Sequence, residues 1–227
     1  MENKKVSMLF VTMAVLFTSC ILLANIAAAK QLQFFSWSMP AGVLVFPIPY
    51  IVSDVMVEVY GFKKFKKVIY LGFAMNILAV VILGIANMWP APVWFEGSEA
   101  FSAVGSSTPR IVLAGLLAYL FGSWVNGIVM SKMKLSNFEK GKGTKGFKTR
   151  AVVSTLAGEF IDSSIFIPVA FLGVLPIEQI PSMILLQVLF KTAYEILILP
   201  VTAQVVKRVK HYEKVEVVGN DQEVVTV

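Results

Sequence analysis

The chain alternates long apolar runs with short polar segments. Six of these runs reach about 20 residues, the length at which a helix crosses a hydrocarbon core of about 30 Å. None shows the strict alternation of apolar and polar residues that a membrane-spanning β-strand requires. The pattern predicts an all-α, polytopic membrane protein with six transmembrane helices, which cover residues 7–29, 38–59, 68–89, 111–131, 150–174 and 181–206.

Prolines interrupt the second of these runs. Pro40, Pro47 and Pro49 lack a backbone N–H and restrict the residue before them, so we expect this helix to begin late or to break near residues 46–50. Broken membrane helices commonly line a cavity. A kinked helix that serves packing alone is the alternative.

The fourth run carries small residues at four-residue spacing. Ala114, Ala118 and Gly122 share one helix face, and Asn126 continues the row. Because small residues let two helix backbones approach closely, this stripe predicts a helix-packing surface.

Composition supports a membrane location and limits the partners. The 227 residues are 57% hydrophobic and 15% charged, whereas soluble domains are about 25% charged. The net charge is +6, but the basic residues lie beside the apolar runs, so we expect the lipid bilayer and not a nucleic acid as a partner. The single cysteine, Cys20, cannot form an internal disulfide.

The basic residues also predict the orientation. Of the 20 Lys and Arg residues, 17 precede the first span or follow the second, fourth and sixth spans. Positive loops favour the cytoplasmic side. We therefore expect a multi-pass protein of the cytoplasmic membrane with both termini in the cytoplasm. It would comprise a six-helix domain at residues 1–206 and a cytoplasmic tail without regular structure at residues 207–227.

Ionisable residues occur in pairs within the predicted spans. The pairs are Asp54 with Glu58, Glu159 with Asp162, and Lys191 with Glu195. A charge taken out of water costs several kcal/mol unless it is paired, so such residues in a membrane segment point to function. At 1.5 Å per residue, Glu159 and Asp162 lie roughly 14 and 18 Å from the cytoplasmic end of the fifth span, near mid-membrane. Lys191 and Glu195 are expected at a similar depth.

Two interpretations of these charges stay open. They could be structural ion pairs, Lys191 with Glu195 and Arg150 with Glu58. Because the acids outnumber the bases, however, at least one acid is left to bind a donor-rich substrate or to take a proton. A carboxylate accepts two parallel N–H bonds, which a guanine-like base offers on its ring edge. The aromatic residues that could stack on such a ring are Phe34, Phe35, Trp37, Phe46, Tyr50, Phe166 and Tyr194.

Motifs of catalysis and metal binding are missing from the sequence. The chain has no HExxH and no GxSxG, its one histidine, His211, lies in the predicted tail, and a single cysteine cannot build a metal site. The glycine- and lysine-rich segment at residues 141–146 lacks the spacing of a phosphate-binding loop. We expect no cofactor, no metal and no enzymatic activity, with a carboxylate-dependent membrane enzyme as the alternative.

Taken together, these motifs resemble the queuosine precursor transporter family, which is grouped among the vitamin uptake transporters. The resemblance covers residues 25–200. It rests on Ala24-Asn25, Pro40-Ala41-Gly42, Ser53-Asp54 through Glu58-Val59-Tyr60-Gly61, Arg150 with Ser154, Gly158-Glu159, Asp162-Ser163, and Lys191 with Tyr194-Glu195.

The resemblance implies a six-helix importer of deazaguanine bases, the nitrile and aminomethyl precursors of the modified tRNA nucleoside queuosine. The implied fold is similar to that of the substrate-binding subunits of energy-coupling-factor transporters. The implied site residues are Asn25, Asp54, Glu58, Arg150, Glu159, Asp162, Lys191 and Glu195, to which we add Phe46 and Tyr194 as aromatic candidates. We expect Glu159 or Asp162 to bind the base edge, and Lys191 and Glu195 to orient the base or to move a proton.

The mode of transport stays open at this point. The chain could be a self-sufficient carrier, with or without coupling to protons, or a binding subunit that needs a separate ATP-driven module. That module would dock on Ala24 and Ala28 or on the stripe from Ala114 to Gly122. A homodimer, an importer of another flat heterocyclic vitamin, and an assembly protein whose charges only pair helices are further alternatives.

Overall fold

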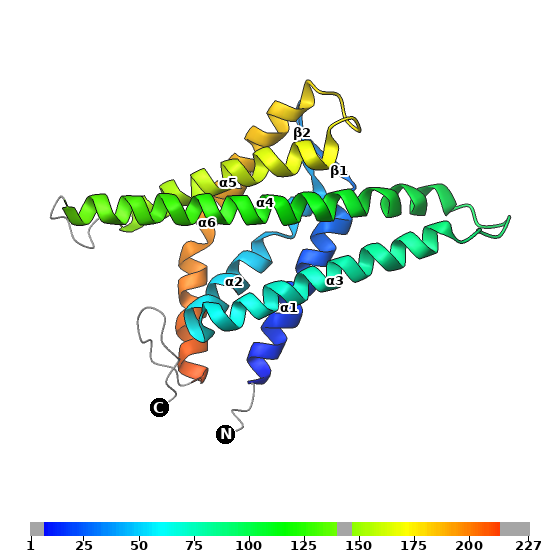
Figure 1. Cartoon of the computed structure of the whole chain (residues 1–227). Helices are drawn as coiled ribbons and strands as arrows, with labels where there is room; N and C mark the ends of the chain where they lie inside the picture. The colour runs from blue at the N-terminus through cyan, green and yellow to red at the C-terminus, as the bar shows by residue number, and fades with distance from the viewer. Residues whose placement is uncertain (1–6, 140–146, 214–227) are drawn as a thin grey trace.

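The computed structural model describes residues 7–139 and 147–213. Helices account for most of this part of the chain, together with one short hairpin (Figure 1). The elements in order are α1 (Met8–Ala27), β1 (Gln31–Phe34), β2 (Trp37–Pro40), the 3-10 helix η1 (Ala41–Leu44), α2 (Pro47–Tyr60), α3 (Phe62–Met88), α4 (Ser98–Glu139), α5 (Phe147–Phe171) and α6 (Gln179–Glu213).

Five of these helices, α1, α3, α4, α5 and α6, are long and apolar enough to cross a membrane. The remaining α-helix, α2, has 14 residues and is therefore about 21 Å long, which is shorter than a hydrocarbon core of about 30 Å. The predicted second span at residues 38–59 is thus wrong in its first half. Residues 31–40 form an antiparallel hairpin instead, with Gln31 opposite Pro40 and Phe34 opposite Trp37.

The late start of α2 confirms the prediction drawn from the prolines. Pro47 and Pro49 fall in its first turn, where an N–H has no partner within the helix and proline is tolerated. Pro40 ends β2 beside the 3-10 turn. The proline spacing therefore shortens α2 rather than kinking a long helix.

Helices α4 and α6 are longer than the apolar pattern indicates. α4 begins at Ser98 instead of residue 111, and α6 continues to Glu213, beyond the predicted end at residue 206. The first residues of the predicted tail are thus helical, whereas residues 214–227 lie outside the described part. Hydropathy marks only where a helix is apolar, and the lysines and arginine of residues 207–213, which favour helix, extend α6 beyond its apolar part.

The small-residue stripe of α4 packs against α5, as predicted. Ala114 and Ala118 are fully buried. A Cβ added at Gly158 would lie 2.8 Å from the Cβ of Asn126, and one added at Gly122 would lie 3.0 Å from the carbonyl oxygen of Gly158. The first distance is shorter than real Cβ contacts and the second is tight, so glycine at both positions allows this close approach.

The other small-residue face, on α1, is also covered by the chain itself. Ala24 and Ala28 are each 3% exposed, and a Cβ added at Gly42 would lie 2.4 Å from the carbonyl oxygen of Ala24. The expectation that either this face or the α4 stripe serves as a docking surface for another module is therefore wrong, because both are occupied within the fold.

Apolar packing forms two clusters. One joins α1, α2 and α3 with the C-terminal end of α6, around Val55, Met56 and Val59. The other joins α4, α5 and the N-terminal part of α6 with the end of α1, around Ala114, Ile167 and Met183. The two clusters divide the molecule into two packed regions that share α1 and α6.

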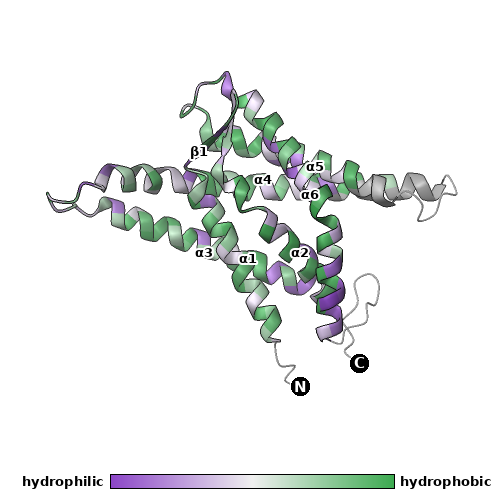
Figure 2. Cartoon of the chain, turned by 180° about the vertical axis from the view of Figure 1, so that it is seen from behind, coloured by the Kyte–Doolittle hydropathy of each residue, from purple (hydrophilic) through white to green (hydrophobic). Residues whose placement is uncertain are grey.

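The ends of the described chain lie at the same end of the molecule, away from the β1–β2 hairpin (Figure 1). Glu213 at the end of α6 accepts hydrogen bonds from Ser7, at the start of α1, and from the hydroxyl of Tyr60, at the end of α2. Figure 2 shows polar residues gathered here, along the last turns of α6 and where α2 meets α3, whereas most of the helical surface is apolar.

Candidate functional site

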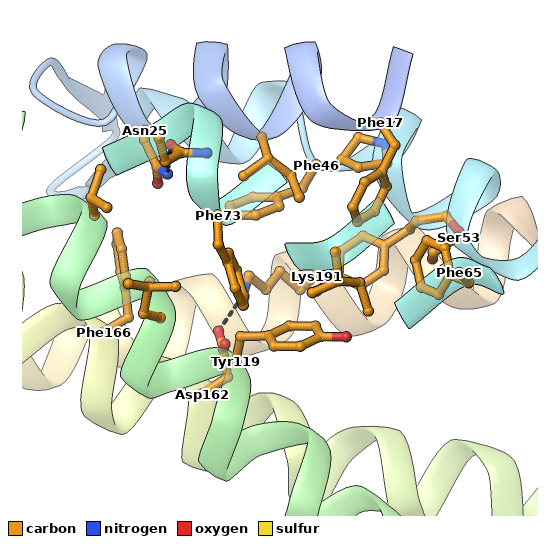
Figure 3. A pocket seen from close by; sticks show the side chains of 18 of the residues that line it. Phe17, Asn25, Phe46, Ser53, Phe65, Phe73, Tyr119, Asp162, Phe166 and Lys191 are labelled. Carbon is orange, nitrogen blue, oxygen red and sulfur yellow. Dashed lines mark hydrogen bonds and ion pairs between the residues drawn. The ribbon is translucent and has the colours of Figure 1, made fainter. Parts of the chain in front are cut away.

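A cavity of about 190 Å³ is lined by residues of all six α-helices and by Phe46, which precedes α2 (Figure 3). A cavity of about 150 Å³ holds a benzene ring, so this one admits a somewhat larger flat molecule. Its walls are mainly apolar and rich in aromatic rings, which come from Phe17, Phe46, Tyr50, Phe65, Phe73, Tyr119 and Phe166.

One wall of the cavity carries a buried ionic cluster. The ammonium nitrogen of Lys191 on α6 lies 3.0 Å from Oε2 of Glu159 on α5 and also pairs with Oδ2 of Asp162, one turn further along α5. Tyr50 on α2 donates a hydrogen bond of 2.5 Å to Oε1 of Glu159. The Lys191 nitrogen lies 4.8 Å from the centre of the Phe46 ring, within reach of a cation–π interaction.

Charge in this cluster is not balanced by Lys191 alone. Two carboxylates face one ammonium, and the side chains of Lys191 and Glu159 are only 3% and 10% exposed. An uncompensated charge at such a depth is costly. The arrangement therefore favours a further positive charge or N–H donors, from a ligand or from a proton.

The two acids have different positions in the cluster. Asp162 lines the cavity and its side chain is 21% exposed, whereas Glu159 lies behind it, between Lys191 and Tyr50. Figure 3 shows Lys191 and Asp162 joined across the cavity wall. Asp162 is thus the acid that a ligand in the cavity would meet.

A polar pair faces the cavity from α1 and α3. The amide nitrogen of Asn25 donates a 2.7 Å hydrogen bond to Oδ1 of Asn76, and Nδ2 of Asn76 donates to the carbonyl oxygen of Gly72. Both asparagines line the cavity, and Asn76 is fully buried. Asn25 was expected near the site from the family resemblance. Asn76 was not singled out as a site residue.

The expected pair between Lys191 and Glu195 is not formed, since Lys191 pairs with the two acids of α5. A lysine that precedes a glutamate by four residues is the less favourable order on a helix, and helical side chains lean toward the N-terminus. Glu195 accepts a 3.0 Å hydrogen bond from Thr155 instead. Neither Glu195 nor Tyr194 lines the cavity.

Asp54 and Glu58 lie apart from the cavity, on the exposed side of α2. Glu58 pairs with Lys210 near the end of α6, whereas the sequence predicted a pair of Glu58 with Arg150. Arg150 falls in the first turn of α5, but its side chain is outside the described part of the structure. The hairpin aromatics Phe34, Phe35 and Trp37 are exposed and also lie away from the cavity.

Several lining residues could not be found by sequence reasoning. Phe17, Phe73 and Tyr119 lie in apolar runs, where an aromatic residue carries no sign of facing a cavity, and Phe65 lies between lysines, outside the predicted third span. Gln187 had a signal, because it precedes Lys191 by one helical turn on the same face of α6. Within residues 7–139 and 147–213, no three His, Cys, Asp or Glu side chains come together as a metal site would require.

Comparisons with known proteins agree on a transporter. A family model described as "Putative vitamin uptake transporter" matches residues 40–205. A protein of Bacillus subtilis (strain 168) named "Probable queuosine precursor transporter" is 25% identical over 192 residues, covering 84% of this chain and 82% of its own. A protein of the same name from Haemophilus influenzae is 23% identical over 150 residues, covering 66% of this chain and 57% of its own. No solved structure matches the chain.

Proposed function

This chain belongs to the vitamin uptake transporter family, whose model covers residues 40–205, and from that premise we propose that it imports queuosine precursors, the deazaguanine bases, into the cell. The family and the five apolar helices make it a multi-pass membrane protein of a transporter family. The substrate, the cytoplasmic membrane as its location and the cytoplasmic position of both termini are parts of the proposal.

The observation that carries the proposal is the cluster of Glu159, Asp162 and Lys191 in the wall of an aromatic cavity. A deazaguanine base is flat and has adjacent N–H donors on one edge. Asp162 is placed to accept from that edge, as carboxylates do from paired N–H groups. Phe46, Phe73 and Phe166 offer rings against the faces of the base.

The same cluster suggests how transport is driven. Since two acids share one lysine, binding of a neutral base leaves an excess negative charge in a site of low polarity. We propose that a proton taken up by Asp162 or Glu159 accompanies the neutral nitrile precursor, whereas the aminomethyl precursor brings its own positive charge. Transport would then need no separate ATP-driven module, and the two small-residue faces considered for docking such a module are buried within the fold.

Uptake by a host without its own precursor transporter and without an energising module tests this proposal. We expect cells that express the chain to accumulate both labelled deazaguanine precursors, and to lose accumulation of the nitrile precursor when the proton gradient is collapsed. Accumulation only after an ATP-driven module is supplied would favour a binding subunit. No binding of either precursor by the purified protein, in a thermal-shift measurement that responds to ligands of the folded state, would overturn the proposal.

A further inference from the structure

Gln187 is a buried polar residue of the cavity wall that the ionic cluster does not use. It lies on α6, is 2% exposed and lines the cavity. No hydrogen bond reaches its side-chain amide from any residue in the described part of the chain, although Asn25 and Asn76 in the same cavity bond to one another. A buried amide without a partner is unfavourable. Its partner is therefore to be sought in the cavity.

The position of Gln187 relative to Asp162 limits what that partner is. Gln187 precedes Lys191 by four residues, about 6 Å along α6, and Lys191 pairs with Asp162 across from it. The carboxylate of Asp162 only accepts hydrogen bonds, whereas an amide also donates. The wall thus offers an acceptor and, beside it, a neutral donor.

We propose that Gln187 is a specificity-determining residue, whose amide N–H donates to the ring carbonyl oxygen of the substrate while Asp162 accepts from the ring N–H and amino groups next to it. The ligand class is a flat base with a carbonyl group beside N–H donors on one edge. This inference rests on the proposed function, because it assigns one substrate edge to the same cavity.

Replacement of Gln187 by methionine gives the sharpest test. Methionine keeps the length of the side chain and removes both polar atoms. In the absence of ligand we expect Q187M to be as stable as the original protein or more stable, since an amide without a partner is lost. A matched control is Q204M, because Gln204 is exposed on the same helix and does not line the cavity.

Binding is measured by titration with two probes, aminomethyl-deazaguanine and its thio analogue, in which sulfur, a weaker hydrogen-bond acceptor, replaces the ring oxygen and the ring N–H is kept. We expect Q187M to weaken binding of the first probe about tenfold or more, the size of one hydrogen bond to a buried group. Binding of the thio analogue should change by less than about twofold. Q204M should bind both probes as the original protein does.

The outcomes separate this inference from the function on which it rests. Equal weakening of both probes by Q187M, or no weakening of either, would overturn the role of Gln187 while leaving the transporter intact. Failure of the original protein to bind either probe would overturn the proposed function itself. If Q187M does not fold, Q187E is the test, because a carboxylate accepts where the amide donates. Q187E should prefer a probe that carries an amino group in place of the ring oxygen. An unchanged preference for the ring oxygen would refute the role of Gln187.

Discussion

At the scale of single residues, the cluster around Lys191 combines a structural and a binding role. Lys191 links α6 to Glu159 and Asp162 of α5, and Tyr50 links Glu159 to α2. Three helices are thus joined at one buried point beside the cavity. Glu159 accepts a hydrogen bond from Tyr50 and pairs with Lys191, whereas Asp162 keeps one face toward the cavity, so substitutions at the two acids should have different consequences.

Glu159→Gln should abolish uptake while the protein remains in the membrane. The amide keeps the shape of the side chain but removes the charge that holds Lys191, so Lys191 and Asp162 would rearrange. The measurement compares uptake with the amount of protein in the membrane fraction. Glu178→Gln, at an exposed position between α5 and α6, is the control, and near-normal uptake by Glu159→Gln would remove Glu159 from the site.

Lys191→Met should destabilise the fold by about 3–5 kcal/mol, because it leaves two buried acids without their cation. The triple variant with Glu159→Gln and Asp162→Asn should recover much of this stability, since no charge is left unpaired, and should still not transport. Thermal unfolding in detergent measures the first effect and uptake the second. A single Lys191→Met protein as stable as the original would show that the cluster is not charged as described.

At the scale of elements, the close contact of α4 with α5 positions the cluster. Gly122 and Gly158 let the two helices meet, and a Cβ added at Gly122 would lie 3.0 Å from the Cβ of Asp162. The glycines therefore set how far Asp162 stands from α4, and hence where its carboxylate enters the cavity. A stripe that serves packing also fixes the geometry of the site.

Gly158→Ala should lower stability by about 1–3 kcal/mol, the usual effect of overpacking, because the added methyl meets the Cβ of Asn126 and the backbone of Gly122. Uptake should fall with it. Gly84→Ala is the control: nothing lies within 4 Å of the added Cβ near the C-terminal end of α3, so this variant should be as stable as the original or up to about 1 kcal/mol more stable. Equal melting temperatures for both variants would contradict the close contact.

At the scale of the whole molecule, the ends of α1, α2 and α6 meet at one polar end. Glu213 joins Ser7 and Tyr60, and Lys210 joins Glu58. The four lysines that begin α3 lie at this junction of α2 and α3. A membrane protein places such a concentration of lysine on the cytoplasmic side, which supports the proposed orientation of both termini.

Reporter fusions measure that orientation directly. A reporter placed after Glu99, in the first turn of α4, should be external, and one placed after Gly143, in the basic segment before α5, should be internal. The cause is the excess of lysine and arginine around Gly143 and their scarcity around Glu99. Reversed activities of the two fusions would overturn the proposed topology.

The amino-acid sequence by itself determined the membrane class, the five long apolar helices, the late start of α2 and the close-packing face of α4. These follow from local rules: the length of an apolar run, the missing N–H of proline and the spacing of small residues on a helix. It also singled out Glu159, Asp162 and Lys191, because a charge within an apolar run stands out without any knowledge of its partners.

Only the tertiary structure decided which charges meet and which residues face the cavity. Lys191 reaches across to α5 and not along its own helix to Glu195, Glu58 pairs with Lys210 on α6, and residues 31–40 form a hairpin in place of half a span. Phe73 lines the cavity from a uniformly apolar run, and Phe65 does so from between lysines. The physical reason is that partners distant in sequence are chosen by helix packing, and helix packing is a property of the whole chain.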